Sequence, residues 1–243
     1  MKRDQELAGR DLEGHTVRRY DGELNHLHMT VLEMGGLVLD QVRLALQALR
    51  HHDDGMVDEV KSRENQVDAL EVKLDEQIAH VIARRGPVAK DLRVIIAFSK
   101  AVADLERIGD EAAKVAILGG DLYPEGNNGP SDMLIRDAHI VGKVARDMLQ
   151  EALDVLDSLS VSRAARLVNS EQNLDEEFQS SLRRLTTFVM EDARNVGHVV
   201  TITLILKALE RIGDHAKNLA EYVIYMVEGQ DVRHHDNPPP VSS

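Results

Sequence analysis

The residues of this chain best suited to chemistry are acidic pairs spaced four positions apart. Four pairs stand out: Glu64/Asp68, Glu106/Asp110, Glu171/Asp175 and Glu210/Asp214. Four residues is just over one helical turn, so both carboxylates of a pair project from one helix face. Where two such helices pack together, four carboxylates converge, and keeping them all ionised without a counter-charge is costly. A bound cation removes that cost, and an oxygen-rich site suits magnesium, calcium, manganese or iron rather than copper.

The helix face that carries Glu106 and Asp110 supports this interpretation. At about 100° per residue, the solvent face expected for that helix consists of Arg93, Lys100, Asp104, Arg107 and Glu111. Glu106 and Asp110 lie off that face, on a flank that is otherwise apolar, where an acid needs a partner. Between them Gly109 costs roughly 1 kcal/mol relative to Ala inside a helix, which indicates close helix packing.

Acids at this spacing are also common on solvated helix faces, so one pair alone would carry no weight. Glu71 and Asp75 continue the line of Glu64 and Asp68, but their counterparts in the second half of the chain are Phe178 and Leu182. The prediction therefore rests on the four pairs present in both halves. Arg107 and Arg211, inside the repeated motif, are expected to be surface ion-pair partners. The alternative is a cation that orients the acids or meets an anionic partner.

The elements that must position these acids are predicted to be helices, because apolar residues recur at three- and four-residue steps along most of the chain. The expected helices span Leu24–His51, Asp54–Arg84, Val88–Leu118, Ser131–Leu159, Ser162–Asp192 and Val196–Glu228. Arg85-Gly86-Pro87 should end the second, and Gly119-Gly120 the third. Residues 1–20 and 231–243 are expected to be polar tails, and residues 123–130 a linker.

The two halves of the chain are copies of one unit. Leu105–Asp110 recurs as Leu209–Asp214, with six identities in a row at an offset of 104 residues. Glu64–Asp68 aligns with Glu171–Asp175 at an offset of 107, which implies a three-residue deletion between the second and third helices. Such self-similarity indicates a tandem duplication. We therefore expect an all-α protein of two three-helix bundles, residues 21–122 and 131–230.

Composition narrows the class of protein. The chain of 243 residues holds 42 Asp and Glu against 29 Lys and Arg, a formal net charge of −13, so direct nucleic-acid binding is not expected. It has no Cys, which excludes disulfides, thiolate zinc sites and cysteine nucleophiles. The N-terminal residues lack the apolar core of a signal peptide, and no apolar run could span a bilayer, so a cytoplasmic protein is expected.

The repeated motif and several other segments resemble the PhoU family. The resemblance rests on Leu105–Asp110 and its copy and spans residues 21–233; it also includes Met34–Gly36, Glu71–Glu76, Lys90–Arg93 and Tyr225–Arg233. It implies an accessory protein of the phosphate-specific transport system and negative regulator of the phosphate regulon. The implied partners are the ATPase subunit of the phosphate ABC transporter, the regulon's sensor histidine kinase and a second copy in a homodimer.

The resemblance also implies metal ions at the acidic pairs, in some members as multinuclear clusters. Iron, manganese, magnesium and zinc remain open as the ion. Family members are not enzymes, and the alternative is a carboxylate-bridged metalloenzyme on a helical bundle. That class needs two Glu-x-x-His motifs on different helices, whereas we find a single weak candidate at Glu23–His26.

Overall fold

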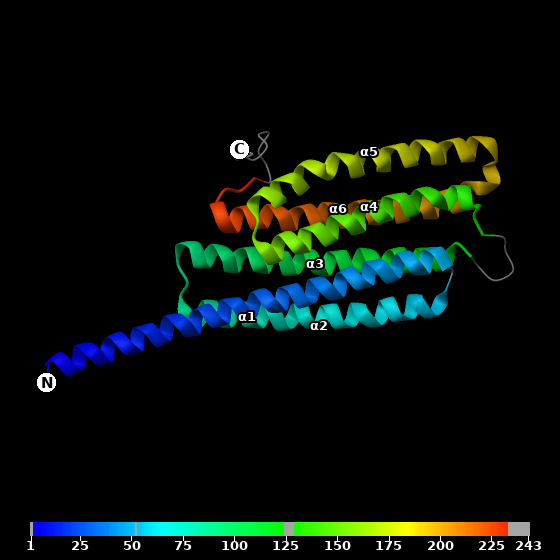
Figure 1. The fold of residues 1–243 in the computed structure, drawn as a ribbon. Helices are drawn as coiled ribbons and strands as arrows, with labels where there is room; N and C mark the ends of the chain where they lie inside the picture. The colour runs from blue at the N-terminus through cyan, green and yellow to red at the C-terminus, as the bar shows by residue number, and fades with distance from the viewer. Residues whose placement is uncertain (1, 52, 124–128, 233–243) are drawn as a thin grey trace.

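The computed structural model describes residues 2–51, 53–123 and 129–232, and within these ranges every regular element is a helix (Figure 1). The long helices are α1 (Lys2–His51), α2 (Asp54–Arg85), α3 (Ala89–Asp121), α4 (Asp132–Ser158), α5 (Val161–Glu191) and α6 (Val196–Glu228). A short 3-10 turn, η1 (Ala193–Asn195), leads into α6. The prediction of an all-α protein is confirmed.

The helices form two antiparallel three-helix bundles that lie against each other (Figure 1). One bundle holds α1, α2 and α3, and the other holds α4, α5 and α6. The bundles meet along two pairs of equivalent helices, α3 against α6 and α1 against α4. The predicted duplication therefore appears in space as two similar units that share a face. No described helix has a stretch long and apolar enough to cross a bilayer.

Local signals set the ends of α2 as predicted. Asp53 caps its N-terminus and accepts hydrogen bonds from the backbone N–H groups of Gly55 and Met56 at 2.8 and 3.3 Å, which satisfies donors that a helix start leaves free. At the other end Gly86 adopts a left-handed conformation with φ of 54° and donates to the carbonyl of Ile82. This conformation favours glycine, and Pro87 then prevents the helix from continuing.

Two helix boundaries differ from the prediction by more than one residue. The α1 helix begins at Lys2 rather than Leu24, because residues 2–20 contain no proline and consist mainly of residues that tolerate a helix. The α3 helix continues through Gly119 and Gly120 to Asp121. Gly119 serves packing instead of termination, since a Cβ there would lie 3.0 Å from Leu49 Cδ1. Residues 124–128 and 233–243, within the expected linker and C-terminal tail, lie outside the described part of the chain.

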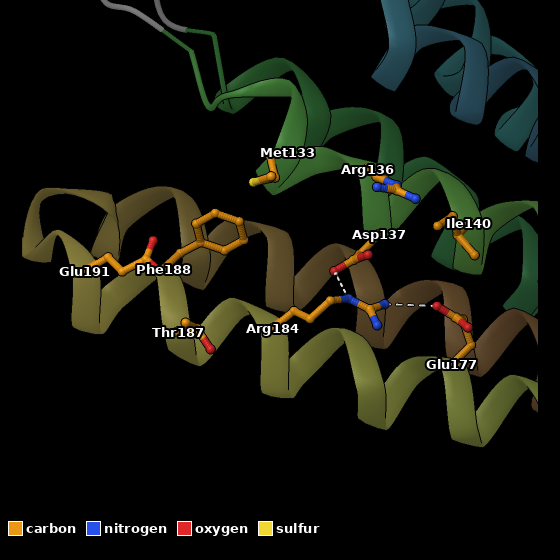
Figure 2. A pocket seen from close by; sticks show the side chains of 9 residues that line it. All are labelled: Met133, Arg136, Asp137, Ile140, Glu177, Arg184, Thr187, Phe188 and Glu191. Atoms are coloured by element: carbon orange, nitrogen blue, oxygen red, sulfur yellow. Dashed lines mark hydrogen bonds and ion pairs between the residues drawn. The ribbon is translucent and has the colours of Figure 1, made fainter.

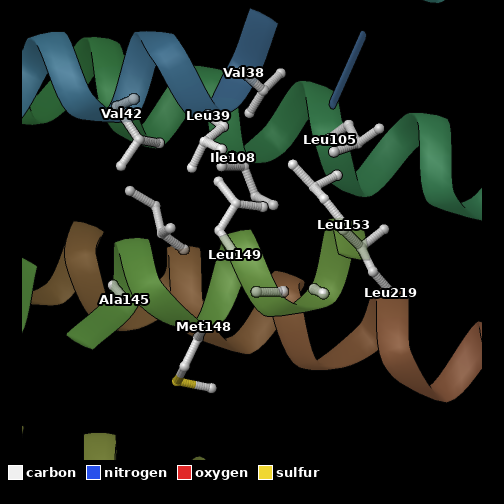
Figure 3. Packing of buried hydrophobic residues seen from close by; sticks show 14 of the residues in the cluster. Val38, Leu39, Val42, Leu105, Ile108, Ala145, Met148, Leu149, Leu153 and Leu219 are labelled. Atoms are coloured by element: carbon white, nitrogen blue, oxygen red, sulfur yellow. The ribbon is translucent and has the colours of Figure 1, made fainter. Parts of the chain in front are cut away.

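A single hydrophobic core runs through both bundles. Figure 3 shows side chains of α1 and α3, such as Val42 and Ile108, facing Leu149 of α4 and Leu219 of α6. These residues are essentially inaccessible to water. Burial of such aliphatic side chains is worth about 1.5–3 kcal/mol each. The two units therefore stabilise each other and hold the acidic helices in fixed register.

The contact between α1 and α4 depends on two glycines. A Cβ at Gly142 of α4 would overlap Leu46 Cδ2 of α1, and a Cβ at Gly35 of α1 would overlap Leu153 Cδ2 of α4. These four residues are two equivalent pairs, since Gly35 aligns with Gly142 and Leu46 with Leu153 at the offset of 107. The two helices thus cross with local two-fold symmetry.

Candidate metal centre

The acidic pairs of the first unit lie on adjoining helices, Glu64/Asp68 on α2 and Glu106/Asp110 on α3. Their mutual influence is greatest at Glu64. Partial burial, together with a hydrogen bond to Asp110 and the charges of Asp110 and Asp68, raises the pKa of Glu64 to about 7, against the opposing effect of a hydrogen bond from Gln41. Glu64 therefore retains a proton near neutral pH unless a cation replaces it.

Two further carboxylates belong to the same cluster. Partial burial and the charges of Asp110, Glu71 and Asp68 raise the pKa of Glu106. Partial burial and the charges of Asp75, Asp68 and Asp110 likewise raise the pKa of Glu71. In both cases the Arg107 guanidinium acts in the opposite direction without cancelling the effect. Glu71, which is not among the four predicted pairs, thus interacts electrostatically with the predicted ligands.

Gln41 of α1 completes the cluster from a third helix. This fully buried side chain donates hydrogen bonds from Nε2 to Glu64 Oε2 and, at 3.2 Å, to the carbonyl of Gly109. The remaining oxygens, Gln41 Oε1 and Glu64 Oε1, are buried and accept no hydrogen bond; the protonated form of Glu64 can donate one to Asp110. Buried oxygens that accept no hydrogen bond, beside a carboxylate cluster, are the kind of ligand atom that a hard cation binds. A polar residue on the apolar stripe of the first helix was the signal that could have found Gln41.

Gly109 allows the three helices to meet at this point. A Cβ on Gly109 would lie 3.2 Å from both Gln41 Oε1 and Glu64 Oε2. The prediction of close packing at this glycine is confirmed. In their present conformations the described Asp, Glu and His side chains do not form groups of three or more that enclose a point where an ion could sit. The site is therefore an acidic face whose carboxylates lie near one another but do not point to a common centre.

The second unit differs from the first at the matching positions. Glu210 forms an ion pair with Lys207 one turn earlier, a cation whose counterpart in the first unit is Ala103. Met148 stands where Gln41 stands, and a Cβ at Gly213 would overlap Leu174 rather than approach polar oxygens. Asp175 is exposed and Asp214 half-buried, while the side chain of Glu171 lies outside the described part. The buried oxygens that accept no hydrogen bond therefore belong to the first unit, and the described part of the second unit has no equivalent at Met148.

A buried polar network joins α3 to α6 and corrects the predicted solvent face of α3. Asp104 is 1% exposed and accepts hydrogen bonds from His215 Nδ1 at 2.9 Å and the Tyr222 hydroxyl at 2.7 Å. Glu111 is 3% exposed and pairs with Arg211 at 2.8 Å. The prediction failed because helical periodicity cannot show that a second bundle covers this face.

This network also defines the partners of the two motif arginines. Arg107 lies 3.4 Å from Asp104 on the same helix, whereas Arg211 reaches across to Glu111 of the other unit. Both guanidinium groups are about half exposed. The prediction that they are ion-pair partners at the surface is confirmed, with the addition that their acidic partners are buried.

Two other hollows lie outside the acidic cluster. Glu23 and His26 line a space of about 380 Å³ between α1 and α2, near His80, and Glu23 holds Arg85 in a bidentate ion pair. The α2 side of this hollow begins at Glu76, about 18 Å along the helix from Glu64 and about 7.5 Å from Glu71, at 1.5 Å per residue. Neither Glu23 nor His26 contributes to the raised pKa values of Glu64, Glu71 and Glu106. The lone Glu-x-x-His therefore does not join the acidic cluster.

The other hollow, of about 470 Å³, lies between α4 and α5 (Figure 2). Arg184 crosses it and donates to Asp137 Oδ2 at 2.8 Å and to Glu177 Oε1 at 2.9 Å. The bond to Asp137 links Arg184 of α5 to α4, while Glu177 lies on the same helix as Arg184.

Comparison with known proteins places both units in one family. A family model described as the PhoU domain matches residues 31–118 and again residues 139–223. The chain belongs to the PhoU family. The phosphate-specific transport system accessory protein PhoU homolog of Pseudomonas aeruginosa is 41% identical over 220 residues, 90% of each chain. The PhoU protein of Escherichia coli K12, named as an accessory protein of the same system, is 32% identical over 92% of this chain and 91% of its own.

Solved PhoU structures share the fold. The crystal structure of PhoU from Pseudomonas aeruginosa superposes with a TM-score of 0.81 over 87% of this chain and all of that one. The PhoU of Streptococcus pneumoniae, at 25% identity, gives a TM-score of 0.79 over 88% of this chain and 99% of its own. The resemblance that the repeated motif suggested is confirmed, and with it the arrangement of two three-helix bundles.

Proposed function

We propose that this protein is the accessory regulator of a bacterial phosphate-specific transport system and acts without catalysing a reaction. The observation that carries the proposal is the double PhoU-domain match, one in each unit, in a chain that aligns with 90% of a relative named for that role. In the proposed role the protein restrains the phosphate regulon when phosphate is plentiful. It does so in the cytoplasm by linking the ATPase subunit of the transporter to a sensor histidine kinase, and it forms a homodimer.

The acidic clusters bind metal ions in this proposal, with Glu64, Asp68, Glu106 and Asp110 as ligands in the first unit and Glu171, Asp175, Glu210 and Asp214 in the second. The unpaired oxygens of Gln41 and Glu64 support the first centre most directly. A bound cation supplies positive charge where Arg107 alone leaves the pKa values of Glu106 and Glu71 raised. Gln41 holds Glu64 in place by donating to it, and Gly109 lets α3 approach closely enough for its carboxylates to share the ion.

Deletion of the gene in its host tests the regulatory role. With an alkaline phosphatase reporter under the phosphate regulon, we expect constitutive expression in high phosphate and restored repression on complementation. A complementing gene that carries Asp110→Asn and Asp214→Asn tests whether repression depends on the metal centres, provided that the variant protein accumulates to the wild-type level. Normal repression in the deletion strain would overturn the proposed regulatory role.

A further inference from the structure

A basic groove lies where the C-terminal part of α1 meets the N-terminal part of α4, at the same end of the molecule (Figure 1). Its volume is about 670 Å³. The lining residues are Arg43, Leu46, Gln47, Arg50, His51, His139, Lys143 and Arg146. Four of the eight are Lys or Arg and none is acidic, in a chain with a net charge of −13. A second hollow of about 850 Å³ shares Arg50, His139 and Lys143 and continues along α4.

Two of the four cations form no ion pair with a described acid, although Asp132 and Asp147 line the adjoining hollow. Arg43 pairs with Asp40 at 3.1 Å and donates to Gln150, and Arg146 pairs with Asp147. Arg50 on one wall and Lys143 on the other are exposed and have no acidic partner among the described residues. Like charges held on opposite walls of a concave surface repel each other more strongly than on a flat, fully hydrated surface.

The two units differ at the positions of these charges. At the offset of 107 residues, Arg43 and Arg50 correspond to Gln150 and Asp157, while Lys143 and Arg146 correspond to Gly36 and Leu39. The symmetry-related end of the α1–α4 contact therefore lacks all four cations. One end of a nearly symmetric contact has acquired positive charge that packing does not require.

The walls of the groove are held rigidly. Leu46 lines the groove and packs against α4 at Gly142, where a Cβ would overlap it. This close approach fixes the backbone from which Lys143 projects relative to that of Arg43 and Arg50. Pre-formed geometry of this kind lowers the conformational cost of binding.

The lining defines the class of ligand. Pockets for small molecules commonly measure about 300–1,000 Å³, so the groove suits a small ligand, and inorganic phosphate alone would leave most of it empty. Leu46 is the single large apolar side chain in its lining, which favours a charge-dense ligand. Arginine binds phosphate oxygens through a planar fork of donors, and lysine adds a point charge. We propose that this groove binds a small anion with two or more linked phosphoryl groups, an oligophosphate or the phosphate chain of a nucleotide.

Isothermal titration of the purified full chain in buffer without divalent metal ions tests the proposal. The probes are tripolyphosphate, ATP and inorganic phosphate, each at physiological ionic strength. We expect tripolyphosphate to bind with Kd on the order of micromolar and at least about tenfold more tightly than inorganic phosphate. ATP that binds as tightly as tripolyphosphate indicates a nucleotide as the ligand, and weaker ATP binding indicates a free oligophosphate.

Two double variants test whether tripolyphosphate binds in this groove. Arg50→Gln with Lys143→Gln should weaken tripolyphosphate binding at least about tenfold, with circular dichroism and thermal midpoint unchanged because both side chains are exposed. The matched control, Lys73→Gln with Arg84→Gln, removes the same charge from exposed positions on α2 and should bind like the wild type. Absence of binding at millimolar tripolyphosphate, or equal losses in the two double variants, would overturn the proposal. Because the readout is direct binding, it is independent of the proposed regulatory role.

Discussion

Leu46 of α1 lies so close to Gly142 of α4 that a Cβ on the glycine would overlap the leucine Cδ2. The equivalent contact, with the roles of the two helices exchanged, places Leu153 of α4 against Gly35 of α1. Each unit therefore contributes one leucine and one glycine to the contact that joins the two bundles. A gene duplication that retains one complementary pair in this way creates a self-matching interface within one chain.

Two adjacent glycines test this contact. Gly35→Ala should lower the free energy of unfolding by about 1–2 kcal/mol, because the new Cβ meets Leu153 inside the core. Gly36→Ala should be neutral or raise it by up to about 1 kcal/mol, because a Cβ there meets no atom within 4 Å and Ala favours the helix. Chemical denaturation of both variants measures the difference. A stabilising Gly35→Ala would contradict the proposed packing.

Removal of one predicted ligand in each unit tests the metal centres. Asp110→Asn should reduce bound metal in the purified protein, because it takes a carboxylate from the cluster that holds the unpaired oxygens of Gln41 and Glu64. Asp214→Asn should have a smaller effect, since Lys207 already supplies positive charge to Glu210. Elemental analysis of the two single variants and the double variant measures the stoichiometry. Wild-type metal content in Asp110→Asn would exclude this assignment.

Gln41, which donates to Glu64, gives an independent test of the same centre. Gln41→Met copies the residue of the second unit, Met148, and removes the donor that orients Glu64. We expect metal affinity to fall about 10–100-fold, measured by competition with a chelator of known affinity. Gln47→Met, at an exposed position on the same helix, is the control and should leave metal affinity unchanged.

The pKa of Glu64 predicts how stability without metal depends on pH. Because its pKa rises from 4.5 to about 7 on folding, the folded state binds this proton more tightly than the unfolded state does. Ionisation of Glu64 therefore destabilises the folded state. This destabilisation is absent below about pH 4.5 and grows until about pH 7. After allowance for solvent screening, we expect Glu64→Gln to be about 1–2 kcal/mol more stable than the wild type at pH 8 and equal to it near pH 4.5. Denaturation of both proteins with a chelator present measures the difference in stability at each pH. A difference that does not change with pH would contradict the raised pKa of Glu64.

Asp104 predicts the opposite pH dependence. Its burial alone would raise the pKa, but hydrogen bonds from His215 and Tyr222, aided by the charges of His215 and Arg107, hold it below the usual value of 3.8. Its contribution to stability is therefore present above about pH 3.8 and is lost as the pH falls through the lower pKa of the folded state. The advantage of the wild type over Asp104→Asn should accordingly shrink in acid.

Truncation separates the buried acid of this network from its exposed partner. Asp104→Ala should cost about 3 kcal/mol at pH 7, because it leaves the Tyr222 hydroxyl and the His215 ring without their acceptor inside the interface. Arg107→Gln should cost less than about 1 kcal/mol, because its guanidinium is 58% exposed. Urea denaturation of the two variants measures both values. Similar losses would show that the network is not the source of the stability.

Much of this architecture follows from local signals. Apolar periodicity located all six helices, and the ends of α6 match the prediction at Val196 and Glu228. Asp53 and the Gly86-Pro87 step defined the boundaries of α2 because capping depends on neighbouring residues alone. The same local logic failed at Gly119, since its contact with Leu49 lies across the bundle.

The helices, the duplication and the family could be predicted from the amino-acid sequence, because each depends on residue spacing and identity along the chain. The same holds for which acids share a helix face. Tertiary structure alone decided which faces meet: Asp104 and Glu111 became buried when α6 covered α3, and Gln41 reached Glu64 when α1 packed against α2. The physical reason is that burial and pairing depend on contacts between helices distant in sequence. How much a charged side chain contributes to stability therefore depends on the contacts that it makes in the folded protein.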